Sequence, residues 1–196
     1  MKRLLVAAVL TTLCTLPAVA ALKRGEKAPD FTAKASLAGK EFQYSLQDAL
    51  KKGPVVVYFY PSAFTGGCNL QAHTFAENKE KFDAAGATII GVSADSIERL
   101  NAFSADPQYC AGKIAVASDA DGKIATAFAL KQGAAKPGMK DTRGMEIDHA
   151  FTERTTFVVT PDHTIAATLS SNDDKISPAE HVEKSLAVVQ ELAAKK

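Results

Sequence analysis

Short runs of consecutive apolar residues mark the predicted strands of this chain. They lie at 55–60, 88–93, 155–160 and, more weakly, 114–117. Continuous apolar runs rich in β-branched residues are typical of strands covered on both faces of a sheet. A further run at 165–169 follows a turn at 161–164, so the last two strands are predicted to form a hairpin. Another hairpin is expected over 31–42, around Ala38-Gly39.

Between these runs, apolar positions recur at helical spacing. The predicted helices cover 70–85, 96–104, 124–130 and 179–194. The last begins after Ser177 and Pro178, a pair that is typical of a helix start. Strands and helices alternate along most of the chain, which predicts one α/β domain with helices covering a central mixed sheet. The segment 131–152 fits no element, and a stretch of this length is either a functional loop or a surface insertion.

The first twenty residues have the pattern of a signal peptide. Two basic residues precede a mostly apolar run that Pro17 ends, and Ala18-Val19-Ala20 has the small residues after which signal peptidase cuts. The run is shorter than the about 20 apolar residues of a transmembrane helix, although an uncleaved membrane anchor is the alternative. We therefore expect a signal peptide at 1–20, one domain at 21–196, export to the bacterial periplasm, and no stable membrane insertion after cleavage.

Composition narrows the classes of function. The 196 residues are 46% hydrophobic and 23% charged, with a formal net charge of +1. These values are ordinary for a globular protein, exclude a disordered chain, and lack the charge excess of a nucleic-acid binder. No phosphate loop or dinucleotide fingerprint is present and the histidines lack metal-ligand spacing, so no cofactor or metal is expected. The three cysteines are too few for a disulfide scaffold, and removal of the signal peptide leaves Cys68 and Cys110.

The segment 61–68 carries the candidate chemistry. It follows the 55–60 strand and ends at Cys68, which is expected in the first turn of the next helix. Unpaired backbone N–H groups and the positive end of the helix dipole favour a thiolate over a thiol at such a position. Gly66 and Gly67 carry no side chain, so their amides can approach a ligand closely. On position alone, Cys68 fits equally well as a small buried apolar residue.

The motif around Cys68 resembles that of the peroxiredoxins. Pro61, Thr65 and Cys68 match a Pro-x-x-x-Thr-x-x-Cys signature that follows the first core strand. Further matching segments occur in the same order at 28–31, 58–61, 91–96, 118–119 and 154–159. Within the AhpC/TSA family, the sequence most resembles the peroxiredoxin Q, or bacterioferritin comigratory protein, type. This resemblance implies a thioredoxin-like fold with an N-terminal hairpin, and the reduction of hydroperoxides.

The resemblance also implies roles for the site residues. The Cys68 thiolate would attack hydrogen peroxide or an organic hydroperoxide and become a sulfenic acid. Thr65 and Arg154 would supply hydrogen-bond donors for the leaving oxygen, and Pro61 would restrict the turn and shield one side of the sulfur. The implied enzyme is a peroxidase of the thioredoxin-dependent type, with a thioredoxin-like protein or a small thiol as reductant. The family also suggests a homodimer.

The chain departs from the pattern of this type at the second cysteine. The usual positions of a resolving cysteine hold His73 and Ser104, which leaves Cys110 as the remaining candidate. Cys110 is expected at the opposite end of the strands from Cys68, whereas a disulfide needs Cα atoms within about 7 Å. If the resemblance holds, Cys68 would be regenerated by Cys110, after the intervening helix unfolds, or through a one-cysteine mechanism or a disulfide between chains.

Two other functions are compatible with this fold class. The chain could be an exported thioredoxin-like thiol–disulfide oxidoreductase or a non-catalytic binding domain. The first activity usually needs a Cys-x-x-Cys pair, and Thr65 occupies the first position of that pair here. The second would not need the complete set of Pro61, Thr65 and Arg154.

Overall fold

The computed structural model describes residues 20–195, so the predicted signal peptide lies outside the described residues apart from Ala20. The strands of the central sheet are β1 (Thr32–Leu37), β2 (Lys40–Ser45), β3 (Val55–Phe59), β4 (Thr88–Ser93), β5 (Ala115–Ser118), β8 (Thr155–Val159) and β9 (Ile165–Ser170). They form one seven-stranded mixed sheet in the order β2-β1-β5-β4-β3-β8-β9. The helices are α1 (Leu46–Leu50), α2 (Gly66–Ala84), α3 (Ile97–Ala105), α4 (Lys123–Ala127), α5 (Ser171–Asp174) and α6 (Pro178–Ala194).

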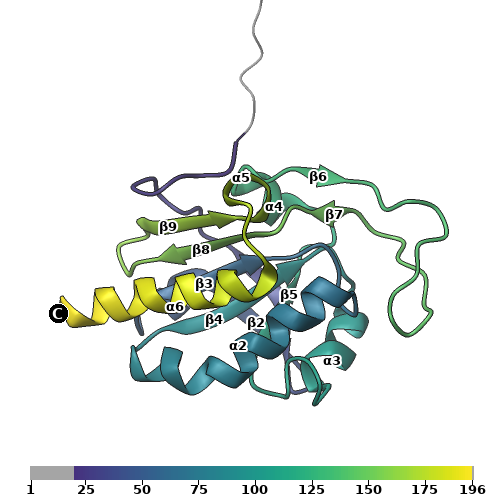
Figure 1. Ribbon diagram of the computed structural model, residues 1–196, viewed down its shortest axis with the longest axis horizontal. Coiled ribbons are helices and arrows are strands. Elements are labelled where there is room, and N and C mark those ends of the chain that lie inside the picture. The colour runs from purple at the N-terminus through teal and green to yellow at the C-terminus, as the bar shows by residue number, and fades with distance from the viewer. Residues whose placement is uncertain (1–19, 196) are drawn as a thin grey trace, which may run out of the picture.

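Helices cover both faces of this sheet. Figure 1 shows α2 and α6 side by side across one face. Side chains of β3 alternate between the faces, as in any strand. Val56 and Tyr58 pack beneath α2 and α6, whereas Val55, Val57 and Phe59 pack on the other side with residues of α1 and α4. Every residue of β3 is buried, which confirms the prediction of an α/β fold with strands covered on both faces.

Both predicted hairpins are present. β1 pairs with β2 in antiparallel register around Ala38 and Gly39, which have φ of 51° and 77°. β8 and β9 are also antiparallel, and they form the opposite edge of the sheet. The helix α2 begins at Gly66, whereas the predicted start was residue 70. The prediction was late because the first turn lacks the apolar spacing that indicates a helix. No helix within residues 20–195 is long and apolar enough for a membrane span.

The prediction that 131–152 contains no element is wrong at both ends of this segment. β6 (Gln132–Gly133) and β7 (Phe151–Thr152) pair in antiparallel register and bring the two ends together. Figure 1 shows the chain leaving β6, running beyond the sheet and returning to β7. We call the stretch between them, residues 134–150, the long loop.

Strand register sets the position of the candidate site. β3 and β4 are parallel, so their carboxyl ends lie at the same edge of the sheet. β8 runs antiparallel to β3, with Thr155 opposite Phe59. Arg154, immediately before β8, is therefore brought beside the turn that connects β3 to α2.

Candidate active site

Cys68 lies in the first turn of α2. Thr65 is the N-cap residue of this helix, and its carbonyl oxygen accepts a hydrogen bond from the Cys68 amide at 2.9 Å. Gly66 and Gly67 are exposed, whereas the Cys68 side chain is only 2% exposed. Their amides begin the helix, where backbone N–H groups lack intrahelical partners. The thiol thus lies just below the surface, at the positive end of the helix.

Arg154 brings a positive charge to the sulfur. Its Nη2 donates to Cys68 Sγ at 3.2 Å, and its Nη1 donates to Gln71 Oε1. Gln71 is fully buried and lies three residues after Cys68, on the same side of α2. Because the guanidinium is a planar fork, engaging both partners fixes its orientation as well as its position. A negative charge on Cys68 would be stabilised by this contact.

A buried histidine supports the strand that carries Arg154. His181 Nδ1 lies 3.0 Å from Thr156 Oγ1, and its Nε2 lies 2.9 Å from Ser171 Oγ. The Ser171 amide in turn donates to the Arg154 carbonyl oxygen at 3.1 Å. Burial, and then the positive charge of Arg154, lower the pKa of His181 to about 4. His181 is therefore neutral near pH 7, and the cation beside Cys68 is Arg154.

The turn before α2 has an unusual backbone. Phe64 has φ of 61°, a left-handed conformation that is strained for an aromatic residue. Its ring is buried against Phe103 and Tyr109, with centroids 5.0 and 5.7 Å away. Thr65 Oγ1 donates to the Ser62 carbonyl oxygen at 2.8 Å, so the hydroxyl proton is already used. The lone pairs of that hydroxyl remain able to accept a hydrogen bond.

Pro61, His73 and Cys110 are the remaining residues singled out from the sequence. Pro61 begins the turn and is half-buried. His73 is half-buried, and its Nε2 lies 3.3 Å from Glu77 Oε1. Cys110 is fully buried in the turn between α3 and β5, and burial raises the pKa of its thiol.

Both cysteines after residue 20 are free thiols. Cys68 follows the carboxyl end of β3, whereas Cys110 precedes the amino end of β5. β3, β4 and β5 are mutually parallel, which confirms the predicted strand topology between the two cysteines. Their side chains nevertheless belong to the same apolar cluster beneath α2 and α6.

Gln71 and His181 were not predicted from the sequence. The spacing of Gln71 from Cys68 could have indicated it, because residues three apart share a helix face. His181 gives no local signal, since its partners lie on β8 and α5. Within residues 20–195, no cluster of three or more His, Cys, Asp or Glu residues is arranged to hold a metal ion.

Comparison with known proteins gives consistent matches. The model of the AhpC/TSA family matches residues 24–168. A Mycobacterium tuberculosis protein with "peroxiredoxin" in its name is 30% identical over 141 residues, which are 72% of this chain and 80% of that protein. The chloroplastic peroxiredoxin Q of Sedum lineare is 42% identical over 85 residues, 43% of this chain and 44% of the plant protein.

Solved structures agree with these relatives. The crystal structure of peroxidoxin BcpB from Mycobacterium tuberculosis superposes with a TM-score of 0.72 at 26% identity, covering 87% of this chain and 98% of that one. Peroxiredoxin Q of Xanthomonas campestris gives a TM-score of 0.63 at 29% identity, covering 82% and 90%. These neighbours confirm the predicted thioredoxin-like arrangement of a mixed sheet flanked by helices.

Proposed function

The chain belongs to the AhpC/TSA family of peroxiredoxins, and we propose that it reduces hydrogen peroxide and organic hydroperoxides at Cys68 with electrons from a thiol. Membership of the family supports a thiol peroxidase. The observation that carries the choice of residue is the contact between Arg154 Nη2 and Cys68 Sγ at the start of α2. A solved relative, the bacterioferritin comigratory protein of Xanthomonas campestris, is described by its alkyl peroxide reduction activity, which supports organic hydroperoxides as one substrate class.

The proposed reaction begins with a hydroperoxide ROOH against the first turn of α2. The Cys68 thiolate attacks the terminal oxygen, the S–O bond forms and the O–O bond breaks. Cys68 becomes a sulfenic acid, and the leaving RO⁻ takes a proton from solvent to give ROH. The Arg154 cation and the N–H dipoles of Gly66 and Gly67 can stabilise negative charge on the reacting oxygens.

Thr65 takes a different part from the donor role that the resemblance implies. Because its own proton goes to Ser62, the Thr65 hydroxyl can accept the O–H of the incoming peroxide. That contact would orient the terminal oxygen toward the sulfur. Arg154 and the helix amides then remain as the donors.

We assign regeneration of Cys68 to external thiols. One thiol condenses with the sulfenic acid, releasing water and leaving a mixed disulfide, and a second thiol displaces Cys68 as the thiolate. The burial of Cys110 and its place before β5 support this over a bond between Cys110 and Cys68. If the first twenty residues direct export, as we propose, the reductant acts outside the cytoplasm.

The test measures peroxide consumption and oxidation of Cys68 in one experiment. The protein, prepared from residue 21, receives one equivalent of hydrogen peroxide or an organic hydroperoxide, and dimedone-trapped sulfenic acid is quantified by mass spectrometry. Cys68→Ser should abolish peroxide consumption, while Cys110→Ser, the matched control, should retain it with dithiothreitol as reductant. Full activity of Cys68→Ser would contradict the proposed function. A Cys68–Cys110 disulfide after one equivalent would contradict only the assignment of external thiols.

A further inference from the structure

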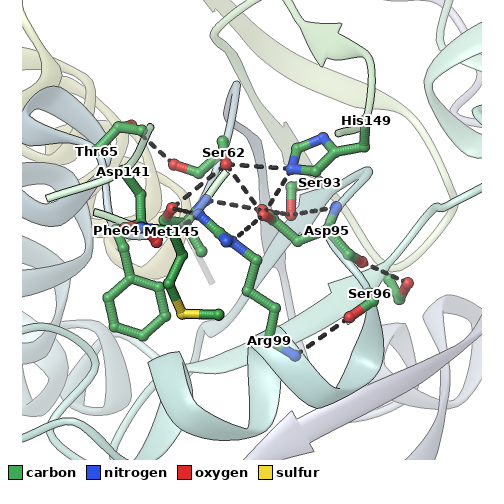
Figure 2. Close-up of polar contacts among 12 residues, drawn as sticks. Ser62, Phe64, Thr65, Ser93, Asp95, Ser96, Arg99, Asp141, Met145 and His149 are labelled. Carbon is green, nitrogen blue, oxygen red and sulfur yellow. Dashed lines mark hydrogen bonds and ion pairs between the residues drawn. The ribbon is translucent and has the colours of Figure 1, made fainter. Parts of the chain in front are cut away.

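Asp95 connects the strand β4 to the turn before α2. Its carboxylate is fully buried just after β4. It accepts hydrogen bonds from Ser62 Oγ at 3.0 Å, from the Ala63 amide at 2.7 Å and from Ser93 Oγ at 2.7 Å, as Figure 2 shows in part. Asp95 thus fixes the first half of the turn. Phe64 and Thr65 follow in the sequence and separate this half from Cys68.

His149, from the long loop, completes the surroundings of this carboxylate. Its Nε2 lies 2.8 Å from Asp95 Oδ1, and its Nδ1 lies 2.9 Å from the Ala150 carbonyl oxygen. Both ring nitrogens therefore face acceptors, which suits a protonated imidazolium. Burial alone would lower the pKa of His149, but the hydrogen bond and charge of Asp95 outweigh it and raise the pKa. The same pair lowers the pKa of Asp95 despite its burial.

The long loop makes a second set of contacts with the turn. The amide and the hydroxyl of Thr142 both donate to the Phe64 carbonyl oxygen, each at 2.9 Å. The Arg143 guanidinium lies over the Phe64 ring, with Cζ 3.3 Å from the centroid. These contacts surround the one residue of the turn that has a left-handed conformation. They can offset the backbone strain that such a residue carries.

Arg99 of α3 joins the two sets of contacts. It reaches Asp95 at 2.8 Å, the Ala63 carbonyl oxygen at 3.1 Å and Asp141 at 2.7 Å. The Asp141 side chain is fully buried, and it also accepts from the amide of Arg143. The long loop is thus anchored to α3 and to the turn by paired charges that are mostly shielded from water.

We propose that His149 is a positioning residue for the reaction of Cys68: by holding the long loop on Asp95, it keeps the turn at 61–65 in the conformation that starts α2 and sets Cys68 against Arg154. This inference rests on the proposed peroxidase function for its rate effect, but not for its structural effect. Its action on the sulfur is indirect: His149 Nε2 holds Asp95, which binds the Ala63 amide, and also lies 3.1 Å from Ser62 Oγ in the turn.

The contact of His149 with Asp95, which holds the long loop on the turn, depends on pH. We call this contact the clamp. A groove of about 630 Å³ opens between α3 and the long loop beside His149, so solvent can reach the histidine. The charged side chains that line this groove are Glu98, Arg99, Arg143, Glu146 and Asp148, and the buried Asp95 contacts His149 directly. Because the folded pKa of His149 is raised, its contribution is fully present below the unfolded value of about 6.5. That contribution is lost as the pH rises through the folded pKa, so alkaline pH should loosen the clamp.

The experiment compares His149→Ala and His149→Gln with wild type, and uses His163→Asn as control. His163 lies in the β8–β9 turn and has φ of 64°, a conformation that asparagine tolerates. Hydrogen exchange of the amides at 62–68 is followed by mass spectrometry from about pH 6 to about pH 9, on either side of the ordinary histidine pKa. The exchange data are corrected for the intrinsic effect of pH. The rate of Cys68 oxidation by hydrogen peroxide is measured on the same samples.

His149→Ala should speed exchange at 62–68 and slow Cys68 oxidation, each by about tenfold, the effect of losing a charged hydrogen bond. His149→Gln can still donate to Asp95, so it should recover most of both values but lose the alkaline loosening seen in wild type. His163→Asn should match wild type. Circular dichroism checks that each variant is folded.

The result that overturns the proposal is unchanged exchange at 62–68 in His149→Ala, whether or not oxidation slows. An alkaline loosening that persists in His149→Gln would also overturn it. The exchange measurement needs no peroxide. If wild-type Cys68 failed to react with peroxide, the proposed function would be wrong. The hydrogen-exchange data would still show whether the clamp exists.

Discussion

Replacing Gly67 by alanine would place a methyl group against the guanidinium that contacts the sulfur. An ideal Cβ at Gly67 lies 3.3 Å from Arg154 Nη2 and 3.3 Å from Pro178 Cγ. Comfortable contact between such atoms begins near about 3.5 Å, so the guanidinium must move by a few tenths of an ångström. The side chain can do so, but at the expense of its 3.2 Å contact with Cys68 Sγ.

The size of the effect follows from this contact. A hydrogen bond to a charged group contributes about 1.5–3 kcal/mol, and a displaced Arg154 would lose roughly half of it. A loss of about 1 kcal/mol from the transition state slows a reaction about fivefold. Gly66→Ala is the matched control, because a Cβ at Gly66 meets no atom within 4 Å. Both changes gain a similar helix propensity, up to about 1 kcal/mol.

The assay must report on Cys68 directly. The chain contains no tryptophan, so quenched-flow trapping of the sulfenic acid is preferable to intrinsic fluorescence. Gly67→Ala should oxidise about fivefold more slowly than wild type, and Gly66→Ala should stay within about twofold. Equal slowing in both variants, or none in Gly67→Ala, would refute the claim that the position of Arg154 sets the rate.

Three further changes test the surroundings of the site. Arg154→Lys keeps the charge but cannot engage Cys68 and Gln71 together, so Cys68 oxidation should slow by about tenfold or more, with little change in the thermal midpoint; an unchanged rate would show that charge alone suffices. His181 has a folded pKa of about 4 against 6.5 unfolded. The unfolded chain therefore binds the extra proton, and stability should fall by about 3 kcal/mol between pH 6.5 and pH 4. His181→Gln should lose this part of the decline in urea titrations, and an equal decline in the variant would contradict the buried neutral histidine. Gly91→Ala would press a Cβ to within 2.6 Å of the Tyr58 ring, so urea unfolding should reveal a loss of about 1–3 kcal/mol; a loss below about 0.5 kcal/mol would mean that the ring moves freely.

The sequence predicted those parts of the fold that depend on local patterns. Consecutive β-branched residues identified β3, β4 and β8, because strands buried on both faces need apolar side chains at every position. The one-turn helices α1 and α5 were missed, since a single turn is too short to reveal a helical period. The start of α2 was placed late for a related reason: Gly66, Gly67 and Cys68 carry no apolar spacing.

The candidate site was predictable only where it follows a linear motif. The segment 61–68 contains three of its residues, Pro61, Thr65 and Cys68. Arg154 was found because its strand resembles the corresponding strand of the family. The pairing of Asp95 with His149 joins residues 54 apart in the sequence, and nothing local indicates which carboxylate a histidine will meet. Such contacts come from tertiary packing, so they had to await the structure.

Because Cys68 is buried, the two halves of the catalytic cycle that we propose for it would make opposite demands on the first turn of α2. A peroxide of a few atoms can reach the sulfur of Cys68, a residue that is 2% exposed. A protein thiol is much bulkier, so forming an S–S bond with it requires that the sulfur be more exposed. A well-ordered first turn of α2 that speeds the oxidation of Cys68 would then slow its reduction back to the thiol. Selection on such an enzyme would act on the ratio of the two rates, so the most rigid form of the α2 start need not be the fittest one.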